Sequence, residues 1–136
     1  MLGEAYERDL HIEAAIQEMR EPVRLEPNNP EAWRRIGLYE NNLTRDKEAR
    51  EPLERAIALA PKEAHYYWAL GDSYLLESTD PANFDRAAEL YRKALSLNGT
   101  NEKALYSFGM ALSRRGKPED LKEAVELFKK LIQLKP

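Results

Sequence analysis

The sequence predicts an all-α fold, a solenoid of about three and a half stacked helix pairs. The first observation is a pattern that recurs every 34 residues and spaces Gly3, Gly37 and Gly71 along the chain. The second is that apolar residues recur at helical spacing, which indicates amphipathic helices. The third is that Pro27 and Pro61, again 34 residues apart, follow the second helix of a copy, where proline cannot continue a helix. A repeat of this length decides the architecture before any other feature is considered.

The first copy, residues 1–29, begins partway through its first helix. Gly3 lies on that helix, and Ala15 lies on a second helix that ends before Pro27. We expect a turn between the two helices, as in the other copies. Glycine and alanine are both small, so two backbones can approach closely where these residues meet. Pro22 lies inside the second helix, where we expect a kink without a break.

The second copy, residues 30–63, shows the pattern most completely. It is preceded by Asn28-Asn29, which with Pro30 signals a turn and a helix start. Pro52 lies inside its second helix, and we again expect a kink without a break. The pattern reads Trp33-x-x-Ile36-Gly37, then Ala49-x-x-x-Leu53, then Ala56 and Pro61.

The third and fourth copies, residues 64–101 and 102–136, carry the pattern with a longer spacing between glycine and alanine. The additions fall between the paired helices, at residues 77–81 and 115–118. Each places a proline near the first turn of the second helix, where its missing N–H costs little. We interpret both additions as lengthened surface loops, with a binding loop as the alternative. The matching residues are Tyr67, Gly71, Ala87 and Tyr91 in the third copy, and Phe108, Gly109, Ala124 and Phe128 in the fourth.

These four copies resemble the tetratricopeptide repeat, and the resemblance covers essentially the whole chain. It implies a right-handed superhelical solenoid of antiparallel helix pairs, here a single array over residues 1–136. In proteins that this chain resembles, the first helix of each repeat lines a concave groove that binds other proteins. The positions that line this groove carry over to a set of candidate partner-binding residues. They are Arg34, Leu38, Asn41, His65, Trp68, Asp72, Lys103, Tyr106 and Met110.

Five groove positions are large and apolar or aromatic, namely Leu38, Trp68, Leu75, Tyr106 and Met110. A contiguous exposed apolar patch usually marks an interaction site, and Trp and Tyr are enriched at binding hot spots. The alternative is that some of these side chains cover the seams between repeats.

One branch of the family binds chaperone C-termini that end in acidic residues, through a clamp of Lys, Asn and Arg side chains. The matching residues here are Arg34, Leu38, Ala69, Lys103 and Ser107. Lys103 is retained and Arg34 is a partial substitute. Since several charge-assisted contacts are lost, we expect no useful affinity for such a peptide.

Composition narrows the function classes further. The 136 residues carry a net charge of −3 with no basic stripe, so we expect no nucleic-acid partner. No apolar run is long enough to span a membrane, and no signal peptide follows Met1, which favours the cytoplasm. The chain has no cysteine, and its two histidines, His11 and His65, lie on different copies. We therefore expect no metal site, no cofactor and no catalytic constellation.

The leading functional hypothesis is a protein-interaction scaffold that holds a peptide or an amphipathic helix of a partner in its concave groove. The first alternative is a structural module that self-associates through uncapped ends, where Leu131 and Leu134 are the expected exposed residues. The second is a non-catalytic appendage of a larger protein. We expect the chain to be a piece of a longer array, with a natural small protein as the rival interpretation.

Overall fold

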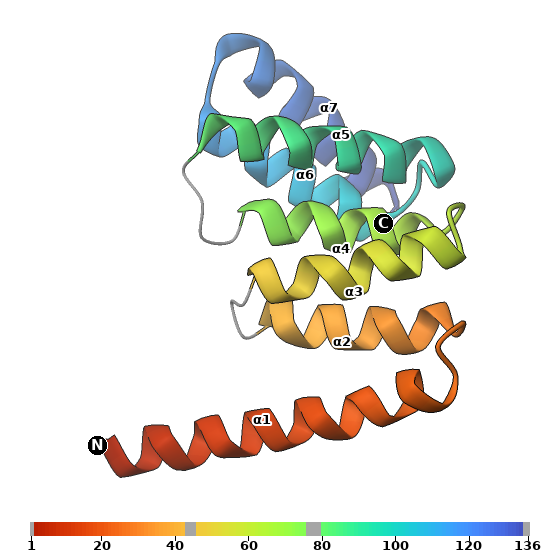
Figure 1. The fold of residues 1–136 in the computed structure, drawn as a ribbon. Helices are drawn as coiled ribbons and strands as arrows, with labels where there is room; N and C mark the ends of the chain where they lie inside the picture. Colours follow the sequence, from red (N-terminus) through yellow and green to blue (C-terminus); the bar gives the residue numbers. More distant parts are fainter. Residues whose placement is uncertain (1, 43–45, 76–79, 135–136) are drawn as a thin grey trace.

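The computed structural model describes residues 2–42, 46–75 and 80–134, and within these ranges the chain forms α-helices joined by turns (Figure 1). The predicted fold class, an all-α solenoid of helix pairs, is confirmed. The extent of a single array over residues 1–136 and its division into copies stay predictions. The helices are α1 (Leu2–Leu25), α2 (Pro30–Asn42), α3 (Asp46–Leu59), α4 (Ala64–Leu75), α5 (Pro81–Leu97), α6 (Glu102–Arg115) and α7 (Pro118–Leu134).

Three antiparallel pairs, α2/α3, α4/α5 and α6/α7, are held together at the glycine of the first helix. A Cβ built on Gly71 would lie 2.7 Å from Cε1 of Tyr91, and one built on Gly109 would lie 2.7 Å from Cζ of Phe128. A Cβ on Gly37 would lie closer still to the side chain of Leu53. Since contacts this short are repulsive, a larger residue at these glycines would push the helices apart. The predicted role of these glycines is thus supported by the packing.

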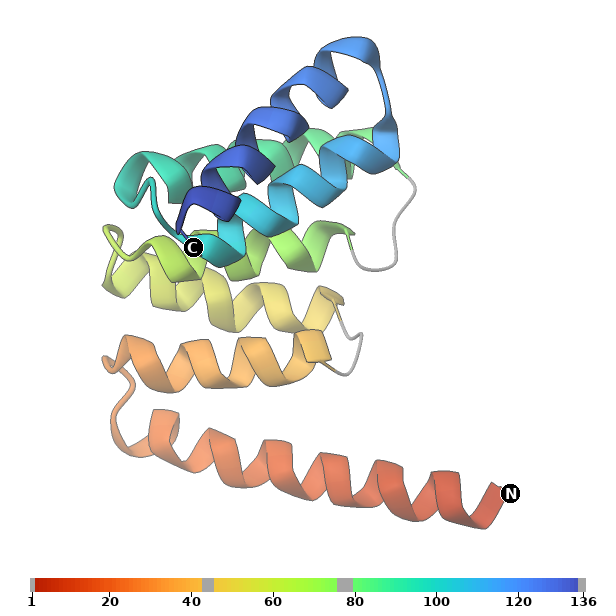
Figure 2. The same ribbon diagram turned by 180° about the vertical axis from the view of Figure 1, so that it is seen from behind.

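The pairs stack so that the first helices lie on the inside of a curve. Helix α2 packs against α4, and α4 packs against α6, whereas among the described residues α3 does not pack against α5, nor α5 against α7. A stack whose inner helices touch while its outer helices separate must bend around the inner helices. The concave face therefore belongs to α2, α4 and α6. Figure 2 shows these helices from the side opposite to Figure 1.

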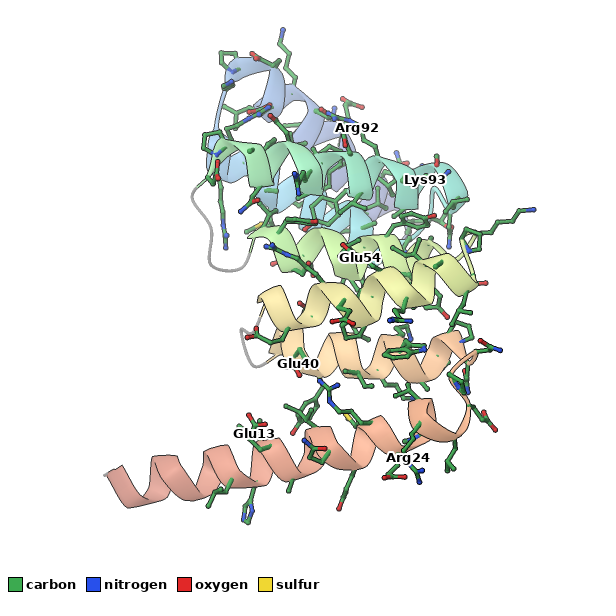
Figure 3. The ribbon with its side chains drawn as sticks, in the orientation of Figure 1. Glu13, Arg24, Glu40, Glu54, Arg92 and Lys93 are labelled. Atoms are coloured by element: carbon green, nitrogen blue, oxygen red, sulfur yellow. The ribbon has the colours of Figure 1, made fainter. Side chains whose placement is uncertain are left out.

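The outer helices are linked by long side chains where their backbones do not meet. Arg92 of α5 pairs with Glu123 of α7, at 3.3 Å between Nη2 and Oε2, and lies over the ring of Phe108. Within the α4/α5 pair, Nζ of Lys93 (labelled in Figure 3) lies 6.0 Å from the ring centroid of Tyr67 on the inner helix α4. Amphipathic side chains of this kind cover apolar surface with their stems and keep the charge near water.

Helix α1 contradicts the turn expected in the first copy. It is one continuous helix from Leu2 to Leu25, and among the described helices it packs against α2 only, diverging from it towards the N-terminus (Figure 1). No glycine, proline, serine, threonine or asparagine lies between Gly3 and Pro22, so the sequence offers little to end the helix. The loose contact leaves a hollow of about 390 Å³ between α1 and α2, lined in part by Ala15 and Met19.

The turns follow the proline and glycine positions. Asp80 caps α5 by accepting a hydrogen bond from the Ala82 amide at 2.9 Å, and Pro81 is the first residue of that helix. Gly116 ends α6 with a φ of 72°, which favours glycine, and Pro118 begins α7. Both prolines are therefore at the predicted helix starts, while residues 77–79 of the first insertion lie outside the described residues. Pro22 and Pro52 lie inside α1 and α3 without breaking them.

The exposed apolar side chains of α7 differ from the predicted ones. Leu131 and Leu134 are partly buried. The uncovered residues instead form one stripe, Leu121, Val125 and Ile132, with 47%, 50% and 69% of their surface exposed. We call these three residues the α7 stripe.

Candidate partner-binding groove

The concave face of α2, α4 and α6 carries the predicted groove residues, in two neighbouring seams. The α4–α6 seam contains Trp68, Asp72, Lys103, Tyr106 and Met110, and the α2–α4 seam contains Leu38 and Asn41. Arg34 lies on α2, and His65 lies at the start of α4 facing the N-terminus of α6.

At the α4–α6 seam, Trp68 is turned partly into the structure. Its indole Nε1 donates a hydrogen bond to Oγ of Ser107 at 2.9 Å, and its ring packs against the main core. Lys103 lies 4.9 Å from the Trp68 ring centroid, a distance at which a cation is attracted to the ring face. Trp68 therefore joins two repeats and exposes only part of its ring to the groove.

Asp72 lies one helical turn beyond Trp68, on the other side of Ser107. The Tyr91 hydroxyl donates a hydrogen bond to Oδ1 of Asp72 at 2.6 Å, which ties α5 to α4. Burial raises the pKa of the Asp72 carboxyl above its ordinary value, and the hydrogen bonds from Tyr91 and Ser107 and the charge of Lys103 offset only part of this effect. Burial and the neighbouring carboxylate also raise the pKa of Tyr91, so its hydroxyl stays protonated and remains a donor.

A hollow of about 260 Å³ opens beside Asp72, between α4 and α6. We call it the Asp72 hollow. Its apolar wall includes Tyr106 and Met110, which are 55% and 37% exposed. Asp72 and the Tyr91 hydroxyl supply its polar groups, together with the guanidinium of Arg114. The full lining is Asp72, Leu75, Tyr91, Tyr106, Ser107, Met110, Ala111 and Arg114.

The α2–α4 seam is more closed. Nδ2 of Asn41 is buried and donates to the Ala69 carbonyl at 3.0 Å, and Leu38 is half-buried against the main core. Arg34 is ion-paired with Glu31 one turn before it, which raises the pKa of the arginine and lowers that of the glutamate. Asn41 and Leu38 thus hold neighbouring elements together, as the seam interpretation of the apolar positions expects, whereas the Arg34–Glu31 pair lies within α2.

The end of the groove near His65 is also part of a seam. Nδ2 of Asn101 lies 3.4 Å from Nδ1 of His65, and Oδ1 of Asn101 caps α6 by accepting from the Ala104 amide.

The exposed apolar patch expected from five residues is smaller than predicted. Of the five, Tyr106 and Met110 are exposed, while Leu38, Trp68 and Leu75 are half-buried.

Four residues that line the Asp72 hollow were not among the predicted groove residues, namely Tyr91, Ser107, Ala111 and Arg114. Tyr91 was predicted only as a residue of the repeat pattern, Ser107 only as a position where the clamp residue is lost, and Ala111 and Arg114 had no predicted role. The spacing gives a signal for Ser107, because it lies four residues after Lys103 and three before Met110 and so shares their helix face. Tyr91 could not be found this way, since its hydroxyl reaches the groove from the outer helix α5.

Other sites are not evident in the part of the chain that the structure describes. Within it, no group of three or more His, Asp or Glu side chains could hold a metal ion. No described helix is long and apolar enough to cross a membrane.

Comparisons with known proteins agree with this architecture. Residues 1–64 match a family model described as tetratricopeptide repeat. The chain is 31% identical over 125 residues to human "Tetratricopeptide repeat protein 13", and 29% identical over 134 residues to human "Protein O-mannosyl-transferase TMTC3". These alignments cover 92% and 90% of this chain but 14% and 15% of those proteins, so the chain spans about one seventh of the length of these relatives.

Solved structures with the same fold include two MamA structures. The "Crystal structure of MamA" has a TM-score of 0.77 at 22% identity, and covers 100% of this chain and 75% of its own. "MamA 41-end from Desulfovibrio magneticus RS-1" has a TM-score of 0.76 at 26% identity, with 97% and 71% covered. The predicted resemblance to the tetratricopeptide repeat is confirmed. This fold is typically non-catalytic and generally binds proteins, and the transferase activity in the name of one relative belongs to that longer protein.

Proposed function

We propose that this chain holds a peptide or an amphipathic helix of a protein partner in the concave groove of α2, α4 and α6. The observation that carries the proposal is the exposed aromatic and apolar wall of Tyr106 and Met110 beside a polar floor at Asp72. Ligand sites in proteins commonly combine an apolar wall with a few fixed polar groups. An amphipathic segment fits this wall, with apolar anchors turned inward and mixed charge at its edges.

The test is capture of partners from the source cell on immobilised protein, followed by measurement of the affinity of the captured partner. Tyr106→Ala removes an exposed aromatic without touching the core, so we expect it to weaken binding about thirtyfold, as for a hot-spot residue, with an unchanged melting curve. Leu59→Ala, an exposed apolar residue on the outer helix α3, is the matched control and should bind normally. Equal binding by both variants would refute the groove as the partner site.

Trp68→Ala is a second variant with a different expected outcome. We expect it to weaken binding by a similar factor. Because Trp68 donates a hydrogen bond to Ser107 and packs against the core, this variant should also lower the melting temperature. Binding that falls with Trp68→Ala but not with Tyr106→Ala would point to a role in stability alone.

A second candidate, self-association through the end of the array, is favoured by the α7 stripe. Counted from Ala124 and Ala87, the equivalent positions in α5 are Phe84, Ala88 and Leu95. There, Ala88 is buried in a core cluster that includes residues of α6, and Phe84 and Leu95 pack against that cluster. Helix α6 therefore covers this face of α5. A second copy of the chain would cover the equivalent face of α7, the α7 stripe.

Sedimentation over a range of concentrations tests this candidate. We expect the average mass of the natural chain to rise with concentration, and Val125→Glu combined with Ile132→Lys to keep the chain monomeric. A natural chain that stays strictly monomeric at high concentration would exclude self-association through α7.

A further inference from the structure

We propose that the Asp72 hollow receives the cationic head of one Lys or Arg side chain from the partner segment, with the carboxylate of Asp72 as its counter-ion. The inference rests on the proposed groove function and names the chemistry of one anchor. It differs from the acidic-peptide clamp of the family branch described above, because the protein here supplies the negative charge.

Asp72 differs from the other charged groove residues in its partners. Arg34 is paired with Glu31, and Lys103 lies over the ring of Trp68. Asp72 accepts hydrogen bonds from the hydroxyls of Tyr91 and Ser107, and among the described residues no Lys or Arg forms an ion pair with it. A carboxylate has about four acceptor positions, so two hydroxyl donors leave room for a cation.

Burial disfavours the charged form of Asp72, which shows that its surroundings do not fully replace water as a solvent for the carboxylate. A cation placed within about 4 Å would favour the charged form, and the attraction is stronger in a partly buried site than in water. The guanidinium of Arg or the ammonium of Lys supplies both the charge and the N–H donors that the free acceptor positions need.

A hollow of about 260 Å³ suits one long side chain, and it opens to solvent between α4 and α6. Tyr106 and Met110 on its wall offer apolar surface to the aliphatic stem of Lys or Arg, and the Tyr106 ring can also stack with a guanidinium. A purely apolar anchor would leave Asp72 buried without a cation, which costs free energy.

Arg114 lines the same hollow and competes with an incoming cation for Asp72. It has no ion-pair partner among the described residues, and its charge repels an incoming cation. We therefore expect the basic residue of the partner to be flanked by an acidic one that pairs with Arg114. Removing the competing charge, as in Arg114→Gln, should strengthen the binding of a simple cationic probe.

The experiment uses two small probes that differ only in charge, N-acetyl-arginine methylamide and its neutral analogue N-acetyl-citrulline methylamide. Each is titrated into the ¹⁵N-labelled natural chain and followed by NMR. We expect the arginine probe to shift amide signals around Asp72, Ser107 and Met110 in a saturable way, with a Kd of about 1 mM. The citrulline probe should produce no such shift.

Asp72→Asn is the decisive variant, because the amide oxygen still accepts the Tyr91 hydrogen bond while the charge is removed. We expect it to lose the response to the arginine probe by at least a factor of about five while its helical content is unchanged. Glu89→Gln removes an exposed carboxylate on α5 outside the hollow and should respond like the natural chain. Saturating arginine probe should also lower the pKa of the Asp72 carboxyl, measured from its side-chain ¹³C signal.

An unchanged response in Asp72→Asn, or equal shifts with the citrulline probe, would overturn the inference. The outcome is separable from that of the groove proposal. If Tyr106→Ala weakens capture of the partner but the arginine probe does not bind, the groove remains and the cation site is wrong. If the probe binds at Asp72 but Tyr106→Ala captures the partner normally, the proposed function fails instead.

Discussion

The first and third copies carry the same glycine and alanine pattern, but the third forms the tight α4/α5 pair, whereas the first forms the single helix α1, which contacts α2. In the α4/α5 pair, Gly71 lies against the ring of Tyr91, and Ala87 is fully buried in the core. At the α1–α2 contact, Ala15 lines a hollow, and the small core there consists of Val23, Ala32 and Ile36 with Met19 and Trp33 beside it.

The difference shows that a small residue promotes close packing only when a turn places a second helix against it. In the third copy, Asp80 and Pro81 start a new helix that brings Tyr91 to Gly71. In the first copy, Gly3 and Ala15 lie on one continuous helix, so they cannot face each other. The pattern by itself is therefore not sufficient for the tight pair.

The largest effect expected from this comparison is that of Gly71→Val. Because a Cβ at Gly71 would already lie 2.7 Å from Tyr91, and Tyr91 is fixed by its hydrogen bond to Asp72, we expect a loss of about 3 kcal/mol in the free energy of unfolding, the upper end for overpacking. Urea denaturation measures it. Gly99→Ala, at a turn glycine whose Cβ would face the flexible end of Lys130, should change stability little. An unchanged midpoint for Gly71→Val would contradict the tight contact.

A paired substitution tests both regions at equivalent positions, Ala15 and Ala49. Ala49 is fully buried in the main core, so Ala49→Leu should destabilise the chain by about 2 kcal/mol through overpacking. Ala15→Leu adds the same atoms beside a hollow of about 390 Å³ and should leave stability unchanged or raise it slightly. Thermal melts of the two variants compare the signs, and equal losses would mean that the α1–α2 contact is as tight as the α2/α3 pair.

A smaller, pH-dependent effect on the free energy of unfolding is expected at Asp72. Asp120 provides the comparison, because its pKa is shifted in the opposite direction. Two hydrogen bonds from Arg115 lower the pKa of Asp120, so this carboxylate stabilises the fold above the unfolded-state pKa of about 4 and loses that contribution as pH falls. The pKa of Asp72 is raised instead, so its charge destabilises the fold increasingly as pH rises from about 4 through the raised value.

The two isosteric variants should consequently respond to pH in opposite directions. Relative to the natural chain, Asp72→Asn should become more stable, and Asp120→Asn less stable, as pH rises from about 3 to about 7. Chemical denaturation at several pH values measures both differences. Parallel trends in the two variants would show that Asp72 already has a cation partner within the chain.

Much of the fold could be predicted from the sequence, because the packing of a helix pair is local and repeats. The spacing of Gly37 from Ala49, and of Gly71 from Ala87, predicted which helices meet and where. The prolines Pro81 and Pro118 predicted where the second helices begin, since the fixed φ and missing N–H of proline suit a helix start. The continuous helix α1 was not predicted, because the matching glycine and alanine outweighed the lack of turn-forming residues between them.

The candidate groove was predicted only in outline. The resemblance to the tetratricopeptide repeat placed Trp68, Asp72, Tyr106 and Met110 on the groove face of the first helices, and their spacing of three and four residues agrees with a shared helix face. The tertiary structure decided that Trp68 turns into the α4–α6 seam, that Asp72 lies beside a hollow, and that the exposed stripe of α7 is Leu121, Val125 and Ile132. These outcomes depend on how closely successive helix pairs approach and on side chains that arrive from another helix, such as Tyr91, and a repeat pattern read along one chain does not contain those distances.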